Sequence, residues 1–133
     1  MRLIAFAGVL VLVLVAMHAS ETSIANAASD GKSIFNTNCS TCHQENGMGS
    51  PGVFPPLAGN KDVTEKDPTK VIGIVLHGLN TPITVEGKQY TGGMPAWKGT
   101  LSNADIAAVL TYVRSSWGNS APAVTEKMVS AVK

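Results

Sequence analysis

The feature that most constrains this chain is the pentapeptide CSTCH, which runs from Cys39 to His43 and holds both cysteines of the sequence. Two thiols three positions apart face the same side of one helical turn, and an imidazole follows directly after the second thiol. Aromatic residues are few and glycine and proline are plentiful, and a small loop-rich domain of this kind needs a disulfide, a metal or another cofactor to complete its core. The pentapeptide is the natural place for such a group to attach.

Three kinds of group that use these residue types fit the pattern poorly. A disulfide between Cys39 and Cys42 would close a loop with two intervening residues, which restricts the unfolded chain little. A thioredoxin-like redox pair expects a βαβ context, which the helical patterns of this chain do not provide. A structural zinc site needs four ligands, and His43 is poorly placed beside Cys42 to join the same tetrahedron, so that His77 or an acid would have to complete it.

Covalent haem is the fourth possibility, and the pentapeptide favours it. C-x-x-C-H is the attachment signature of c-type haem. The helical spacing lets Cys39 and Cys42 reach the two vinyl groups along one edge of the ring, and His43 then supplies the proximal iron ligand. We therefore predict one haem c, attached through both thiols.

The first residues are typical of an export signal. Arg2 precedes an apolar run over residues 3–17, and Ala25-Asn26-Ala27 fits an A-x-A cleavage site. We expect a signal peptide over residues 1–27 and one small periplasmic domain over residues 28–133. The apolar run is shorter than the ~20 residues of a spanning helix, so membrane contact is expected only if the segment stays uncleaved as an anchor.

The charged residues exclude one class of partner. The formal net charge is +1, and the lysines are spread among acidic residues. A nucleic-acid-binding surface would show clustered lysine and arginine, so no nucleic-acid partner is expected.

Hydrophobic periodicity predicts three helices and a weaker fourth, separated by long loops. The fourth would pack Met128, Val129 and Val132 on one face. Asp67 and Gly78 are the expected start and stop of the second helix, and Ser102 with a following acid forms the capping box of the third. A hairpin is expected within 81–93. The predicted helices cover residues 29–38, 67–79, 102–117 and 124–133.

Taken in order, these features resemble a class I cytochrome c over nearly the whole mature segment. The helix SDGKSIF precedes CSTCH, PPLAG fits the family's P-x-L-x-G, GGMPAW resembles its distal-ligand loop, and IAAVLTYVRSSW resembles its last helix. The resemblance implies an all-α fold of three to four helices, with long loops wrapped around one covalent haem. It also implies that Gly31 and Phe35 pack near Tyr112.

The resemblance also implies roles for residues outside the pentapeptide. The carbonyl of Pro55 would accept a hydrogen bond from the His43 ring nitrogen that does not bind iron, which fixes the tautomer. Leu57 is the leucine of the P-x-L-x-G string and would contact the haem. Apart from the resemblance, Trp97 is expected to fill the core or to bond a propionate through its indole N–H. The hydroxyls of Tyr90 and Thr91 lie near Met94 in the sequence and are expected to bond its sulfur or a propionate.

Met94 is the expected distal ligand. Pro95 stiffens the backbone after it, and Gly92 and Gly93 before it allow close approach to a flat cofactor. Its place in the sequence lets the intervening chain wrap the ring and return on the other face. The rivals are Met48, which lies too near the attachment site; Met128, which fits a packing position; and His77, whose imidazole would give bis-histidine ligation.

An iron with two protein ligands predicts one-electron transfer, not catalysis. The expected partners are redox proteins such as a dehydrogenase, a nitrite reductase, a cytochrome complex or a terminal oxidase, with the protein as a soluble carrier or as a subunit of a respiratory complex. The alternative is a haem enzyme or gas sensor, such as a peroxidase, in which Met94 is labile.

Overall fold

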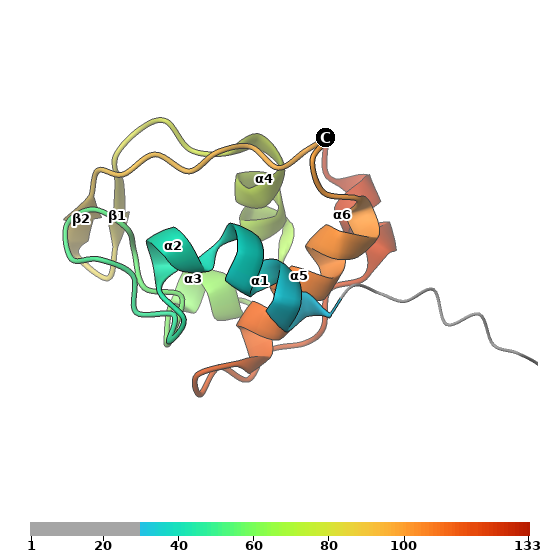
Figure 1. The fold of residues 1–133 in the computed structure, drawn as a ribbon, viewed down its shortest axis with the longest axis horizontal. Coiled ribbons are helices and arrows are strands. Elements are labelled where there is room, and N and C mark those ends of the chain that lie inside the picture. Colours follow the sequence, from blue (N-terminus) through green and yellow to red (C-terminus); the bar gives the residue numbers. More distant parts are fainter. Residues whose placement is uncertain (1–29) are drawn as a thin grey trace, which may run out of the picture.

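The computed structural model describes residues 30–133 (Figure 1). The expected signal peptide over residues 1–27 lies outside the described residues. The described part is mainly helical, with one two-stranded antiparallel sheet. Its elements are α1 (Gly31–Asn38), α2 (Ser40–His43), α3 (Lys61–Thr64), α4 (Thr69–His77), β1 (Ile83–Val85), β2 (Lys88–Tyr90), α5 (Asn103–Ser115) and α6 (Glu126–Ala131).

The predicted helices are confirmed as α1, α4, α5 and α6, and α2 and α3 are two further helices of four residues each. Helix α5 has the expected capping box: the amide of Asp105 donates to Ser102 Oγ (3.1 Å), and the amide of Ser102 donates to Asp105 Oδ2 (3.2 Å). Helix α4 begins later than expected, because Asp67 Oδ1 accepts from the amide of Thr69 (3.0 Å) and Pro68 occupies the cap position.

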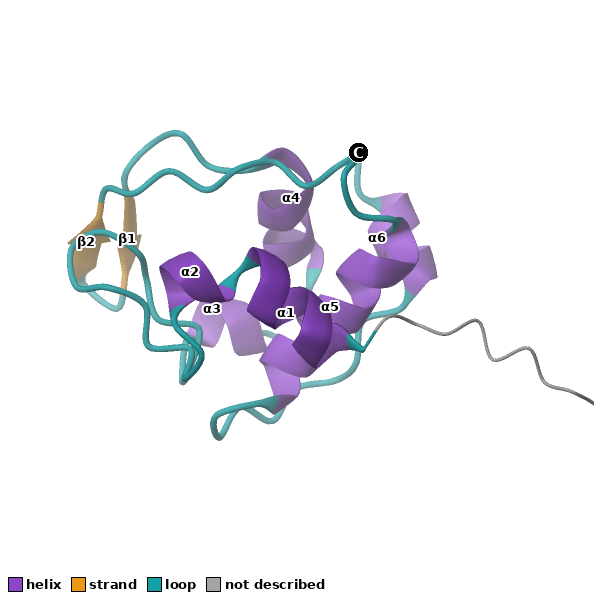
Figure 2. Cartoon of the chain, in the orientation of Figure 1, coloured by secondary structure: helices purple, strands orange, loops and turns teal. Residues whose placement is uncertain are grey.

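The hairpin is also present, and its turn explains its register. Ile83 pairs with Tyr90, and the turn residues Glu86 (φ 48°) and Gly87 (φ 77°) both have positive φ. Positive φ at both central residues matches the twist of a two-residue hairpin turn. Figure 2 shows the hairpin standing at the end of the molecule away from α6.

Helix α1 packs directly on α5, as the resemblance implies. A Cβ at Gly31 would overlap the carbonyl oxygen of Ala108, so only glycine permits this approach. The rings of Phe35 and Tyr112 have centroids 5.6 Å apart, and Trp117 joins them. Helix α6 differs from expectation in one residue, because Met128 is 42% exposed and Val129 is the member of its face that is buried.

The apolar core has two halves. One half packs α1 against α5, with Ile34, Phe35 and Val113 among its members. The other half packs α4 and α6 against α5, with Ile72 and Val129 fully buried. No helix within residues 30–133 is long and apolar enough to cross a membrane.

Candidate haem site

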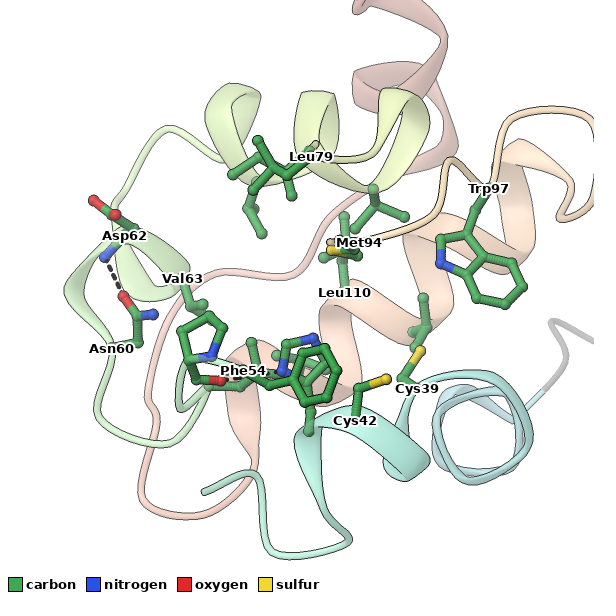
Figure 3. Close-up of a pocket in the computed structure, with 18 of the residues that line it drawn as sticks. Cys39, Cys42, Phe54, Asn60, Asp62, Val63, Leu79, Met94, Trp97 and Leu110 are labelled. Carbon is green, nitrogen blue, oxygen red and sulfur yellow. Dashed lines mark hydrogen bonds between the residues drawn. The ribbon is translucent and has the colours of Figure 1, made fainter. Parts of the chain in front are cut away.

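A cavity with about 150 Å³ of space, partly open to solvent, lies between the two halves of the core. Val63 and Val113 line it from the α1 half, and Val71, Val75 and Leu110 line it from the α4 half. Seven residues that the sequence assigned to the cofactor line this cavity: Cys39, Cys42, His43, Pro55, Leu57, Met94 and Trp97. Figure 3 labels four of them, Cys39, Cys42, Met94 and Trp97.

The two thiols are presented by α2. The amides of Cys42 and His43 both bond the carbonyl of Cys39 (3.2 and 3.0 Å), which forms one tight turn, and Gln44 (φ 63°) ends it. The thiols are not joined in a disulfide. Burial, with a smaller contribution from Cys42, raises the pKa of the Cys39 thiol to about 11. A thiol that stays protonated is a poor redox nucleophile.

His43 is buried and fixed in one tautomer. Its Nδ1 lies 3.1 Å from the carbonyl oxygen of Pro55, and because a carbonyl only accepts, Nδ1–H is the donor. The contact implied by the resemblance is therefore present. Burial lowers the pKa of His43, and the bond to Pro55 opposes part of that effect. A neutral imidazole with its proton on Nδ1 leaves the Nε2 lone pair available to a metal.

The loop that carries Pro55 is fastened by residues that sequence reasoning missed. Asn119 is buried; its Nδ2 donates to the carbonyls of Leu57 (3.0 Å) and Val113 (2.8 Å), and its Oδ1 accepts from the amide of Gly59 (2.8 Å). Trp117 Nε1 donates to the carbonyl of Glu45 (3.0 Å). These bonds tie both ends of the loop to the end of α5. The only signal in the sequence was that Trp117 and Asn119 lie in the string SSWGN.

The Met94 loop is fastened to the end of α4. Met94 and Leu79 exchange backbone hydrogen bonds of 2.8 and 2.9 Å, and the amide of Trp97 bonds the carbonyl of Val75 (3.0 Å). The loop thus supplies a partner to a last-turn carbonyl that has none within the helix. Gly78 (φ 73°) permits the approach, because a Cβ there would lie 2.5 Å from the carbonyl oxygen of Met94.

Gly92 lines the cavity together with Gly93, and it also lies against a second loop. A Cβ at Gly92 would lie 2.6 Å from Phe54 Cε1 and from the carbonyl oxygen of Val53, so the residue permits close approach of two loops. Thr91 Oγ1 donates to the carbonyl of Gly52 (3.2 Å), which joins the same two loops. The threonine hydroxyl therefore closes the rim of the cavity.

The rivals of Met94 lie outside the cavity. Met48 is 57% exposed, and Met128 lines a separate groove beside the start of α4. His77 Nε2 donates to the carbonyl of Lys133 (3.0 Å) at the surface. Within residues 30–133, no three His, Cys, Asp or Glu side chains gather where they could hold a metal ion, so the zinc alternative finds no further ligands there.

The charged residues of the cavity lining lie at one edge. Lys70 Nζ and Asp62 Oδ1 form an ion pair of 2.8 Å, with both side chains more than a third exposed. In Figure 3, Asp62 lies across the cavity from Cys39 and Cys42.

The residues present fit haem c. The lining is almost wholly apolar, as is usual for a cofactor site. Two thiols and one imidazole line that space from the pentapeptide, and one thioether lines it from the Met94 loop. In Figure 3, Met94 lies below α4, across the cavity from the cysteines of α2.

The chain resembles known proteins in sequence. The family model described as Cytochrome c matches residues 28–117. A cytochrome c-552 of Thermus thermophilus is 39% identical over 94 residues, which are 68% of this chain and 70% of the relative. A second Thermus thermophilus cytochrome c-552 is 39% identical over 99 residues, 72% of this chain and 66% of that protein.

The cytochrome c subunit of a quinone-type alcohol dehydrogenase from Gluconobacter oxydans is 38% identical over 92 residues, 69% of this chain. The match spans 19% of that subunit, so this chain corresponds to a small part of it. With the family match covering most of the described domain, the chain belongs to the cytochrome c family and carries haem c on Cys39 and Cys42.

Proposed function

We propose that the protein is a one-electron carrier of the bacterial cell envelope that passes electrons between redox proteins. The bound haem c supplies the Fe(II)/Fe(III) couple. His43 would hold the iron through an imidazole nitrogen, and Met94 would hold it through its thioether. The observation that carries the proposal is that both side chains line one apolar cavity together with the two attachment cysteines.

These two side chains also determine the chemistry. With His43 and Met94 on the iron, no position is open to a substrate, which favours electron transfer over catalysis. The thioether of Met94 is a soft ligand that favours Fe(II) and raises the potential. The apolar cavity walls act in the same direction, because a low-dielectric surrounding disfavours the additional charge of Fe(III).

The docking face in this proposal is the rim formed by residues 47–53 and the Met94 loop. Met48 and Val53 are among the exposed large apolar side chains of the described residues, at 57% and 43%. Residues 46–60 carry no charged side chain. A small apolar contact suits brief exchange with a redox protein. The relatives that are dehydrogenase subunits make a dehydrogenase the first partner to test, and docking through an uncharged rim predicts weak dependence on salt.

The ligand assignment is tested by spectroscopy of the haem-loaded protein. We expect the ferric form to show a weak far-red band from iron–sulfur bonding, and the ferrous form to bind carbon monoxide poorly at neutral pH. Met94→Ala removes the band and admits carbon monoxide, whereas the control Met48→Ala leaves both unchanged. Ready carbon monoxide binding by the wild-type protein would favour the enzyme or sensor alternative instead.

Periplasmic location and cleavage after Ala27 belong to the same proposal. They rest on the basic start, the apolar run and the A-x-A site of the first residues. The intact mass of the purified protein tests them: loss of residues 1–27 supports export with cleavage, and retention of these residues supports an anchor.

A further inference from the structure

Arg114 is a fully buried cation near the end of α5. Its side chain is 0% exposed, and it donates from Nε to the carbonyl of Pro122 (3.0 Å). Its two terminal nitrogens donate to the carbonyls of Val63 (2.6 Å) and Glu65 (2.9 Å). All of its recorded acceptors are backbone oxygens, and no carboxylate within residues 30–133 forms an ion pair with it.

The buried guanidinium of Arg114 stays positively charged. Burial lowers the pKa of Arg114, but a guanidinium starts so far above neutrality that it keeps its proton in proteins. Three carbonyl dipoles solvate it, and they do not cancel its net charge. A buried charge is also screened far less by solvent and salt than one at the surface.

The charge lies directly behind the wall of the haem cavity. Val63, whose carbonyl accepts the shortest of the bonds, lines the cavity, and so does Val113, the residue before Arg114. Both valines belong to the apolar half of the core that α1 and α5 share. The medium between the guanidinium and the cavity is therefore packed hydrocarbon and peptide.

We propose that Arg114 sets the midpoint potential of the haem, as a fixed positive charge that favours Fe(II) over Fe(III). Oxidation removes one electron, which goes to the redox partner, and leaves one more positive charge on the cofactor. A cation behind the cavity wall opposes that added charge and so raises the potential. The inference deepens the proposed electron-carrier function, but it depends only on the change in charge and not on which side chain is the sixth ligand.

Three variants separate the charge from the hydrogen bonds. Arg114→Gln removes the charge, and Arg114→Lys keeps it but cannot reach three carbonyls in the same geometry. Lys127→Gln, on the exposed face of α6, removes one positive charge from the surface as the matched control. The midpoint potential of each haem-loaded protein is measured by spectroelectrochemical titration, and its thermal midpoint by far-UV circular dichroism.

We expect Arg114→Gln to lower the midpoint potential several-fold more than Lys127→Gln, since an effective dielectric of about 20 in place of about 80 gives a fourfold difference at equal distance. Arg114→Lys should melt at a lower temperature and keep the wild-type potential. A purely structural arginine would give the opposite pattern, with the potential of Arg114→Lys falling together with its melting temperature, and that result would overturn the proposal.

Arg114→Gln shifting the potential no more than the control would overturn it as well. Should the glutamine variant not retain haem, Arg114→Lys decides alone, by keeping or losing the wild-type potential. Failure of the proposed ligation is seen separately, because the far-red ferric band of the wild-type protein reports Met94 and not Arg114.

Discussion

Asn119 offers the sharpest test of how the site loop is fastened. Replacing it with alanine removes an amide that bonds two segments lying far apart in the sequence. Its Nδ2 donates to the carbonyls of Leu57 and Val113, and its Oδ1 accepts from the amide of Gly59. The side chain is 7% exposed, so water does not readily replace these bonds.

The expected loss follows from those contacts. Each of the three bonds contributes roughly 1 kcal/mol net, so Asn119→Ala should lower the free energy of unfolding by about 3 kcal/mol. For a domain of this size that corresponds to a fall of roughly 12–24 °C in melting temperature. Asn119→Asp keeps the acceptor for Gly59 and loses both donors, so it should be destabilised by at least as much as the alanine variant.

Guanidinium unfolding of the haem-loaded protein, followed by far-UV circular dichroism, measures this quantity. The control is Asn103→Ala: Asn103 lies at the surface with one bond, from Nδ2 to Ser130 Oγ (3.2 Å), and should change stability by no more than about 0.5 kcal/mol. If Asn119→Ala unfolds within about 0.5 kcal/mol of this control, the loop is fastened by other contacts and the reasoning fails.

Three further predictions concern the second half of the site, the start of α4 and the core. Gly78→Ala should weaken the far-red ferric band because a Cβ would press on the Met94 carbonyl, whereas Gly52→Ala, with nearly the same φ (+74° against +73°) and no atom within 4 Å, should leave the band intact. Hydrogen bonds from Thr69 lower the pKa of Asp67. Its carboxylate therefore stabilises the fold above about pH 4 and loses that effect as pH falls through the folded-state pKa. Asp67→Asn should melt at a lower temperature than wild type at pH 7, and the difference in melting temperature should disappear in acid. A variant with Cys39 and Cys42 both replaced by alanine should not melt cooperatively when prepared without haem.

The elements that could be predicted are those whose ends are determined by neighbouring residues. Asp30, Thr125 and the Ser102 capping box each bond an amide within three positions, so their helices begin where the sequence indicates. The pentapeptide from Cys39 to His43 is local in the same sense. Helix α3, with four residues, is too short for hydrophobic periodicity to reveal it.

The residues that could not be predicted act across long separations. Asn119 bonds a residue 62 positions away, and Arg114 bonds one 51 positions away. Hydrogen bonds of this kind leave no periodic trace in a single sequence. Arg114 did carry one weak signal, because it lies four and eight residues after Leu110 and Ile106, on the apolar stripe of α5. A charged residue on such a stripe must find polar partners.

The hydrogen bonds of Asn119 and Arg114 matter because they hold segments around the cavity between the two apolar clusters. At about 24 cal/mol per Å³, leaving the roughly 150 Å³ of the cavity unfilled would cost about 4 kcal/mol, which is a large part of the stability of an ordinary domain. Haem therefore completes the core, so the surrounding side chains do not have to rearrange to fill the cavity. Cys39 packs against the α1 half of the core and Met94 against the α4 half. With Cys39 on one half and the proposed distal ligand on the other, the cofactor would join two clusters that otherwise meet at α5 and Leu101. Binding of the cofactor and closure of the core would then be one event.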